Sequence, residues 1–211
     1  MSHKPSRRLL YEVPSLRTDG QEEAIAALSR LAADSAPDVA AHMERTGRLA
    51  AAFVKELGLG GPLARVVVAT ARLHDIGKLG VPPWLMEKGG PLTQFEFGLM
   101  REHTLIGQEL LERRRELLPI GSLVRSTHER WDGSGYPDCL RGAAIPLPSR
   151  MVAICDAFDA MTKPRSYSGS MSISAALTEL ERCAGTQFDP GAVEVFCGLF
   201  ESRFDHWAKG A

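Results

Sequence analysis

The sequence predicts an all-α fold, and two observations carry that prediction. Apolar residues recur at steps of three and four, which places them on one face of a helix. Residue types that begin or end helices separate these apolar stretches. No alternating pattern indicates a ladder of strands, so we expect roughly eight helices in a compact bundle.

Length and composition fit a single domain. The chain has 211 residues, enough to bury a sizeable core. Its 25 Lys and Arg residues nearly balance its 26 Asp and Glu residues, so no net charge favours a nucleic-acid polymer or a membrane surface. No apolar stretch is long enough for membrane insertion. The cysteines lack metal-binding spacing, and without a visible signal peptide we expect reduced thiols and a cytoplasmic location.

Residues 1–35 are expected to form an N-terminal arm and one short helix ahead of the main domain. The arm is basic, which suits a tether for a partner or an anion, and one short strand is expected over residues 9–13. Periodic apolar residues predict a helix over residues 21–33, and Pro37 separates it from the next helix.

The helix after this break carries a histidine on its apolar face. The inward positions are Val39, His42, Thr46, Leu49, Phe53 and Leu57. Asp38 lies one turn before His42 on the same side. A core histidine is usually only hydrogen-bonded, but an aspartate and a histidine at this spacing also suit a metal ion.

A buried helix over residues 62–73 delivers His74 and Asp75 to an apolar environment, and Gly77 suits its end. Burying an imidazole and a carboxylate without partners costs several kcal/mol. We therefore expect a metal ion, mutual contact or hydrogen bonds to satisfy them. The alternative is a simple helix end at which Asp75 pairs with Lys78.

Two more histidines occupy apolar helix positions downstream. A connector over residues 81–91, rich in Pro and Gly, suits a lid or wall. The capping box begun by Thr93 predicts a helix with His103 on its inward face. In the following helix, Val124 and His128 repeat a spacing of four.

The helix that carries His128 is expected to run into a tight, preset loop over residues 131–137, whose aromatic side chains can face a ligand. A helix over residues 149–161 then places Asp156 and Asp159 on one face. Two further helices follow, the last of them begun by an Asp-Pro cap, and residues 201–211 are expected to form a C-terminal tail.

Histidines and aspartates thus gather on the apolar faces of separate predicted helices. The set is His42, His74, Asp75, His103, His128 and Asp156. Six buried polar groups with purely structural roles would be costly. Imidazole and carboxylate without thiolate suit Fe, Mn, Zn or Co rather than a closed structural zinc site. Asp75 can bridge two ions, and ions about 3.5–4 Å apart can activate a water while holding a phosphoryl oxygen, so the set indicates phosphate-ester hydrolysis.

These residues lie in motifs that resemble the HD-GYP subgroup of the HD-domain phosphohydrolases. The matching segments are His42 with Arg45, residues 73–78, His103, residues 128–137 and residues 156–162. The likeness covers about residues 36–200, and the Trp-Asp-Gly-Ser-Gly-Tyr-Pro loop is its diagnostic part. The resemblance implies an all-α fold, two or three divalent metal ions, commonly Fe or Mn, and hydrolysis of cyclic di-GMP to linear pGpG, often on to GMP.

Matched residue by residue, the resemblance implies that the six histidines and aspartates are metal ligands. Asp38 stands where some members add a carboxylate for a third ion. Lys78 and Arg165 match positions that hold substrate phosphates, and Tyr136 is expected to shape the pocket wall. Asp75 and Lys78 are the expected catalytic pair.

Two departures from the family pattern weaken this expectation. The family usually has two adjacent histidines before the Glu of the loop, but here the first is Thr127, so one ion loses a strong ligand. Ser168 stands where the family has a second cation after Arg165, so phosphate binding should weaken by the loss of one charge-assisted bond.

Three functions remain open at this stage. The first is a phosphodiesterase for cyclic di-GMP or a related cyclic dinucleotide. The second, motivated by Thr127 and Ser168, is a degenerate domain that binds a cyclic dinucleotide or a partner protein without hydrolysis. The third is a nucleotidase of the wider HD group, which leaves the Gly-Tyr-Pro loop without a role. Any regulator is expected to be a separate protein or the basic arm.

The ligand inventory also predicts unequal metal affinities. His42, His74, Asp75 and Asp156 supply four donors for one ion, which should bind tightly. The other ion has only His103, His128 and a shared Asp75, so it should exchange.

Overall fold

The computed structural model describes residues 20–163 and 170–208, with side chains described as far as residue 200. The helices are α1 (Gln21–Ser35), α2 (Pro37–Glu56), α3 (Gly61–Leu73), η1 (Ile76–Gly80), α4 (Pro83–Met86), α5 (Gln94–Arg101), α6 (His103–Glu112), η2 (Arg115–Leu117), α7 (Leu118–Arg125), η3 (Gly142–Ala144), α8 (Leu147–Thr162), α9 (Ile173–Arg182) and α10 (Pro190–Ala208). Within these residues β-pairing is limited to an isolated bridge between Ala184 and Phe188. The all-α prediction is confirmed.

The expected helix starts are present as hydrogen-bonded caps. Thr93 Oγ1 accepts a hydrogen bond from the Glu96 amide, and the Glu96 carboxylate accepts one from the Thr93 amide, which is the capping box that begins α5. Ser172 caps α9 through the amide of Ala175. The strand expected over residues 9–13 lies outside the described residues.

One expected helix is divided in two. Residues 94–112 form α5 and α6, which meet at Glu102. Side chains compete there for backbone acceptors, since the His103 imidazole bonds to the Met100 carbonyl at 2.6 Å and the Thr104 hydroxyl donates to the Arg101 carbonyl at 3.0 Å. His103 therefore stands in the first turn of α6 rather than in the middle of one long helix.

The second departure concerns His128, which was expected within a helix. Helix α7 ends at Arg125, and His128 follows in a turn. The Thr127 amide and hydroxyl both donate to the Val124 carbonyl, at 3.2 and 2.8 Å, which closes the last turn of the helix. The histidine consequently projects from the turn between α7 and the loop that follows it.

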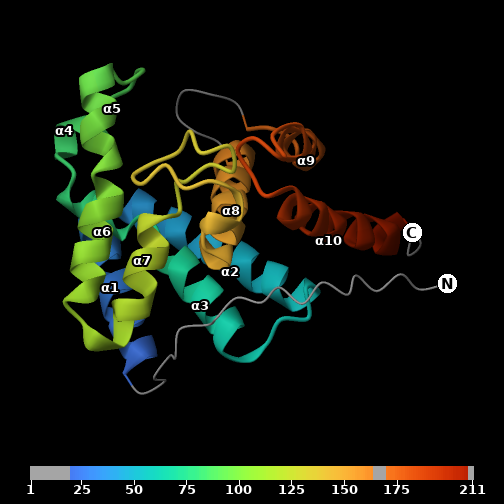
Figure 1. The fold of residues 1–211 in the computed structure, drawn as a ribbon, viewed down its shortest axis with the longest axis horizontal. Coiled ribbons are helices and arrows are strands. Elements are labelled where there is room, and N and C mark those ends of the chain that lie inside the picture. The colour runs from blue at the N-terminus through green and yellow to red at the C-terminus, as the bar shows by residue number, and fades with distance from the viewer. Residues whose placement is uncertain (1–19, 164–169, 209–211) are drawn as a thin grey trace.

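Two apolar clusters hold the bundle together. One joins α2, α3, α8, α9 and α10 around Phe53, Phe158 and Phe196, and the other joins α1, α2, α3, α6 and α7 around Ile25 and Leu73. Figure 1 shows α9 and α10 on one side and α4 to α7 on the other, with α2, α3 and α8 between them. Because α2 and α3 contribute to both clusters, they fix the two halves relative to each other.

Helix α1 contributes to this core although the sequence suggested a boundary after residue 35. Ala24, Ile25, Leu28 and Ala32 of α1 are buried in the second cluster. Helix α10 likewise continues to Ala208, past the expected boundary at residue 200. No helix in the described part of the chain combines the length and the apolar character needed to cross a membrane.

Candidate metal centre

The six histidines and aspartates singled out in the sequence lie together in the structure. They come from α2, the turn after α3, the start of α6, the turn after α7, and α8. They form two groups, in each of which one ligand atom per residue lies within 4.8 Å of the others: His42, His74 and Asp156, and Asp75, His103 and His128. Each group is a set of donors that can hold a metal ion.

Asp75 lies between the two groups. Its Oδ2 is 3.5 Å from Nε2 of His74 and 3.7 Å from Nε2 of His42. Its Oδ1 is 3.4 Å from Nε2 of His103 and 3.9 Å from Nε2 of His128. The side chain is only 1% exposed, so one carboxylate offers one oxygen to each group within the protein interior.

The imidazole rings are oriented by bonds at their other nitrogen. Nδ1 of His74 bonds to the Ala71 carbonyl at 2.9 Å, and Nδ1 of His103 bonds to the Met100 carbonyl at 2.6 Å. Each Nδ1 therefore donates a proton, which leaves Nε2 as the acceptor that faces the centre.

Several atoms that face the centre are buried without a hydrogen-bond partner among the described residues. They are Nε2 of His74, His103 and His128, and Oδ1 of Asp75. An unpartnered buried imidazole or carboxylate oxygen is costly, whereas each is a good ligand for a divalent ion. The residues present therefore fit a metal ion in each group.

Asp159 and Arg45 support the first group, and their part was not anticipated from the sequence. Oδ2 of Asp159 lies 2.8 Å from Nδ1 of His42, and Arg45 binds the same carboxylate through Nε at 2.8 Å and Nη2 at 2.9 Å. The sequence spacing could have indicated this contact. His42 and Arg45 are three residues apart on α2, as are Asp156 and Asp159 on α8, so each pair lies on one helix face.

Buried charges shift the ionisation of these groups. Burial opposes the charge on His42, but hydrogen bonds to Asp156 and Asp159 outweigh it and raise its pKa to about 9. Burial lowers the pKa of His103 to about 4. Although burial works in the opposite direction, Lys78 and His74 hold the pKa of Asp75 well below its ordinary value, and His42 does the same for Asp156. At neutral pH both aspartates are thus ionised, as metal ligands must be.

The segment after Asp75 is fixed by close packing. A Cβ on Gly77 would lie 1.9 Å from the His103 carbonyl oxygen and 2.4 Å from the Gly107 amide nitrogen, so only glycine fits against the first turns of α6. The next residue, Lys78, turns back and places Nζ 2.5 Å from Oδ2 of Asp75. The Asp75–Lys78 ion pair expected as an alternative to metal binding thus exists beside the ligand groups.

The loop after His128 forms one wall of the centre. A Cβ on Gly135 would lie 2.3 Å from the Arg130 amide nitrogen, so the loop folds tightly on itself. The Tyr136 ring then stacks on His128, with centroids 5.3 Å apart and an interplanar angle of 11°. Glu129, which is buried, holds the end of the loop by accepting hydrogen bonds from the amides of Asp138 and Leu140.

A cavity of about 310 Å³ opens between this wall and α8. His128 and Asp156, one from each ligand group, form part of its lining. Arg101 at the end of α5 and Gln187 after α9 line other parts of it. The centre is thus accessible from a pocket of the size that proteins use for small molecules.

The structure leaves other expected site residues outside this arrangement or undescribed. Asp38 is exposed on α2 and belongs to neither ligand group. Thr127 is only 2% exposed and uses its hydroxyl proton on the Val124 carbonyl. Arg165 and Ser168 lie outside the described residues.

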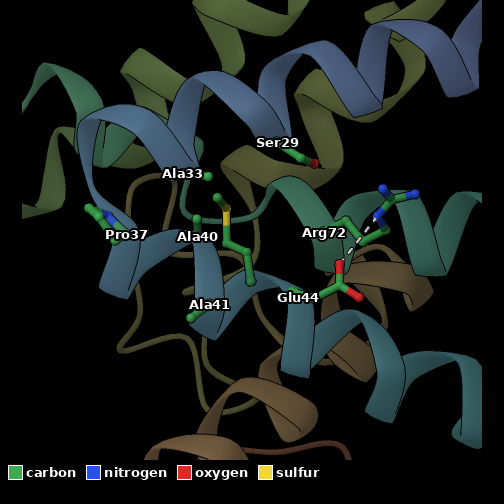
Figure 2. Close-up of a pocket in the computed structure, with 8 residues that line it drawn as sticks. Ser29, Ala33, Pro37, Ala40, Ala41, Glu44 and Arg72 are labelled. Atoms are coloured by element: carbon green, nitrogen blue, oxygen red, sulfur yellow. Dashed lines mark ion pairs between the residues drawn. The ribbon is translucent and has the colours of Figure 1, made fainter.

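A larger hollow of about 360 Å³ lies elsewhere, between α1 and α2 (Figure 2). Ala33, Ala40 and Ala41 line much of it, and its charged groups, Glu44 and Arg72, lie 4.0 Å apart in an ion pair. The lining contains no histidine, and none of the metal-ligand groups of the described residues borders it. We therefore place the candidate site at the smaller pocket.

Fold and site together define an all-α bundle protein with two adjacent groups of histidine and aspartate side chains that could hold divalent metal ions. The family model of the HD domain matches residues 26–192. The chain therefore belongs to the HD domain family, and the resemblance noted in its motifs is confirmed.

Known proteins similar to this chain cover most of it. It is 38% identical over 170 residues to a cyclic di-GMP phosphodiesterase of Thermotoga maritima, an alignment that spans 80% of this chain and 46% of that protein. It is 38% identical over 208 residues to the cyclic di-GMP phosphodiesterase response regulator RpfG of Xanthomonas campestris pv. campestris, spanning 93% of this chain and 55% of that protein. The chain thus spans about half the length of these curated relatives.

A solved structure shows the same fold. The crystal structure of V-cGAP3, a cyclic GMP-AMP specific phosphodiesterase of Vibrio cholerae, superimposes with a TM-score of 0.64 at 21% sequence identity. The superposition covers 86% of this chain and 49% of that one. At this identity the likeness concerns the fold alone.

Proposed function

We propose that the protein is a metal-dependent phosphodiesterase that hydrolyses cyclic di-GMP to the linear dinucleotide pGpG, or a related cyclic dinucleotide to its own linear product. A second hydrolysis to GMP is tested in the same assay. The observation that carries the proposal is the pair of ligand groups, with Asp75 offering one oxygen to each and with buried imidazole nitrogens that lack a hydrogen-bond partner. His128 and Asp156, one from each group, line a pocket. The activities named for its relatives support the same reaction class.

The ligands support two divalent ions, for which we propose Fe or Mn. Imidazole nitrogen and carboxylate oxygen without thiolate suit these metals. When bound, two such ions supply the Lewis acidity that polarises a phosphoryl group and lowers the pKa of a water. A third ion at Asp38 stays part of the proposal, and it would need further ligands because Asp38 lies outside both groups.

Protein side chains then position the substrate and its charge. The Lys78 ammonium, which pairs with Asp75, would neutralise negative charge that develops on the phosphoryl oxygens. Tyr136 excludes water from one side of the centre, because its ring covers His128. We assign a phosphate-binding role to Arg165 on the family resemblance.

Thr127 favours a second candidate function, a domain that binds a cyclic dinucleotide without hydrolysing it. The second group has two imidazoles and the shared Asp75, and the Thr127 hydroxyl already donates to a backbone carbonyl. If the second group binds no ion, the two-ion arrangement proposed for hydrolysis is incomplete. We further propose a cytoplasmic protein that responds to a separate regulatory protein.

The test is hydrolysis of cyclic di-GMP by purified protein loaded with Fe(II) or Mn(II) under reducing conditions, with pGpG and GMP resolved by chromatography. Asp75→Ala should abolish turnover because it removes the carboxylate whose two oxygens face the two groups. Asp34→Asn, an exposed substitution on α1, is the matched control and should retain it. A metal-replete protein that binds the dinucleotide yet releases no linear product would favour the non-hydrolytic domain.

A further inference from the structure

The pocket beside the metal centre has few polar groups free to bind a ligand. Glu129 is occupied by the backbone amides of residues 138 and 140, and Arg130 donates to Ser134 at 2.9 Å. Among the described residues, no hydrogen bond engages the side-chain amide of Gln187, and no carboxylate pairs with the guanidinium of Arg101. One neutral amide and one cation therefore remain available within the same pocket.

Part of the pocket lining is apolar and formed mostly by small side chains. Ala153 and Ala157, one turn apart on α8, line the pocket beside Asp156, and Phe188 lies next to Gln187 with 5% of its surface exposed. A surface of alanines and a buried aromatic residue admits a flat ring closely. Nucleobases are typically recognised in this way, with a face against apolar side chains and hydrogen bonds at an edge.

We propose that this pocket receives one nucleoside half of the cyclic dinucleotide, with Gln187 bonding to the edge of its base and Arg101 holding a phosphate. The inference rests on the proposed function, because it assigns the pocket to that function's substrate. It makes Gln187 a specificity-determining residue and Arg101 a general anchor.

The backbone around Gln187 is held in place by the loop that carries Tyr136. The Trp131 amide donates to the Gln187 carbonyl at 3.1 Å, and the Asp132 amide donates to the Thr186 carbonyl at 2.8 Å. The Gln187 amide in turn donates to the Cys183 carbonyl at 3.0 Å. A side chain that distinguishes bases binds best when its backbone is already fixed before the ligand binds, and these hydrogen bonds fix the backbone of Gln187.

Arg101 is held by rings rather than by an opposite charge. Its guanidinium carbon lies 4.4 Å from the Phe97 ring centroid and 4.9 Å from that of Tyr136. Cation–π contacts orient a guanidinium while leaving its N–H groups available at the ring edge. The Tyr136 ring that Arg101 contacts also stacks on His128 of the second ligand group, so a single ring separates the cation from that group.

The two side chains should have different effects on selectivity. A glutamine amide pairs with complementary donor and acceptor atoms, and the edges of guanine and adenine differ in those atoms. Every cyclic dinucleotide carries the same phosphates, so Arg101 should contribute equally to all of them.

The experiment compares kcat and KM for cyclic di-GMP, 3′3′-cyclic GMP-AMP and cyclic di-AMP in the metal-loaded full chain. Gln187→Leu should change the ratio of kcat/KM between the guanine and adenine substrates by about 10-fold. Arg101→Met should raise KM about 10-fold for every substrate and leave that ratio unchanged. Gln94→Leu and Arg48→Met, both exposed and away from the pocket, are the matched controls.

The outcomes separate this inference from the proposed function. A wild-type protein that hydrolyses none of the three dinucleotides overturns both. If the wild type is active and Gln187→Leu lowers kcat/KM equally for all substrates, the amide does not read the base. An unchanged KM in Arg101→Met overturns the phosphate contact. Melting temperatures equal to the wild type show that neither variant acts through loss of the fold.

Discussion

Asp159 acts on the candidate centre through His42. It orients the imidazole by accepting from Nδ1, and Arg45 fixes the carboxylate in turn. Such partners make a ligand more basic and hold its ring in the productive direction. Asp159 also favours the protonated ring, and together with the larger effect of the hydrogen bond to Asp156 it raises the pKa of His42 to about 9 despite burial.

We predict that Asp159→Asn weakens the tighter metal site about 10–100-fold, because the ring loses its charged partner. Metal content after dialysis and calorimetric titration of stripped protein measure this. Asp34→Asn, at an exposed position, is the control. The deficit should persist near pH 9, where protons compete less for His42 in the wild type, and equal affinities there would contradict an orienting role.

Thr127 stands where the HD-GYP pattern usually has a histidine, so the second ligand group has one imidazole fewer. We predict one tight and one exchangeable ion in the wild type, and two tight ions with faster hydrolysis in Thr127→His. Thr127→Val should leave metal affinity unchanged, because the hydroxyl it removes already donates to the Val124 carbonyl. Titration of metal into stripped protein decides the matter, and two equally tight ions in the wild type would refute the weak second site.

The sequence indicated these candidate ligands because an imidazole in an apolar helical stripe is unusual. His42 and His103 could be recognised in that way, and Asp75 beside His74 followed from the buried helix before it. The sequence did not reveal the role of Asp159, because a carboxylate three residues after Asp156 looks like a second ligand rather than a partner of His42. Only the packing of α2 on α8 distinguishes those roles.

At the scale of helices, caps were predictable but interruptions were not. The capping box of Thr93 and Glu96 that begins α5 spans only four consecutive residues, so the sequence alone reveals it. The break at Glu102 depends on where His103 and Thr104 direct their side chains, which the tertiary position of α6 decides. The end of α7 before His128 has the same origin, since Thr127 takes the Val124 carbonyl.

The capping box gives a prediction for acid stability. A hydrogen bond from Lys88 and bonds from Thr93 lower the pKa of Glu96 from 4.5 to about 2. A lowered folded-state pKa means that the stabilisation is complete above about pH 4.5 and is lost as the pH falls toward 2. Glu96→Gln should therefore lower the melting temperature at pH 7 and converge with the wild type in acid.

Melting curves between pH 7 and pH 3 test this convergence. Glu87→Gln, at an exposed position close by, is the control and should show no such trend. A difference between Glu96→Gln and the wild type that stays constant over this range would show that the carboxylate charge does not support α5.

For the whole molecule, the ligand groups tie both apolar clusters to one centre. Helices α2 and α3 belong to both clusters. His42 lies on α2, and His74 directly follows α3. Ions that bind only the folded chain stabilise it by mass action, about 2.7 kcal/mol at a metal concentration 100 times the dissociation constant. For a chain of this size each kcal/mol corresponds to a shift of about 2–4 °C in melting temperature.

We therefore predict that stripping the metal with a chelator lowers the melting temperature by roughly 5–10 °C, and that Mn(II) restores it. Asp75→Ala should remove most of the metal-dependent shift in melting temperature, because the two oxygens of that carboxylate face the two ligand groups. Calorimetry with and without metal measures the shift. A melting temperature independent of metal in the wild type would contradict a centre formed by the native fold.

The ligands of the two groups are spread unevenly along the chain, and this has a consequence for synthesis on the ribosome. The second group ends at His128, whereas the first needs Asp156 on α8 and draws its orienting carboxylate from Asp159. During translation the second group is thus complete in sequence while the first group still lacks Asp156. If the second group binds its ion more weakly, as predicted, a growing chain would hold metal only loosely until α8 has left the exit tunnel and packed against α2.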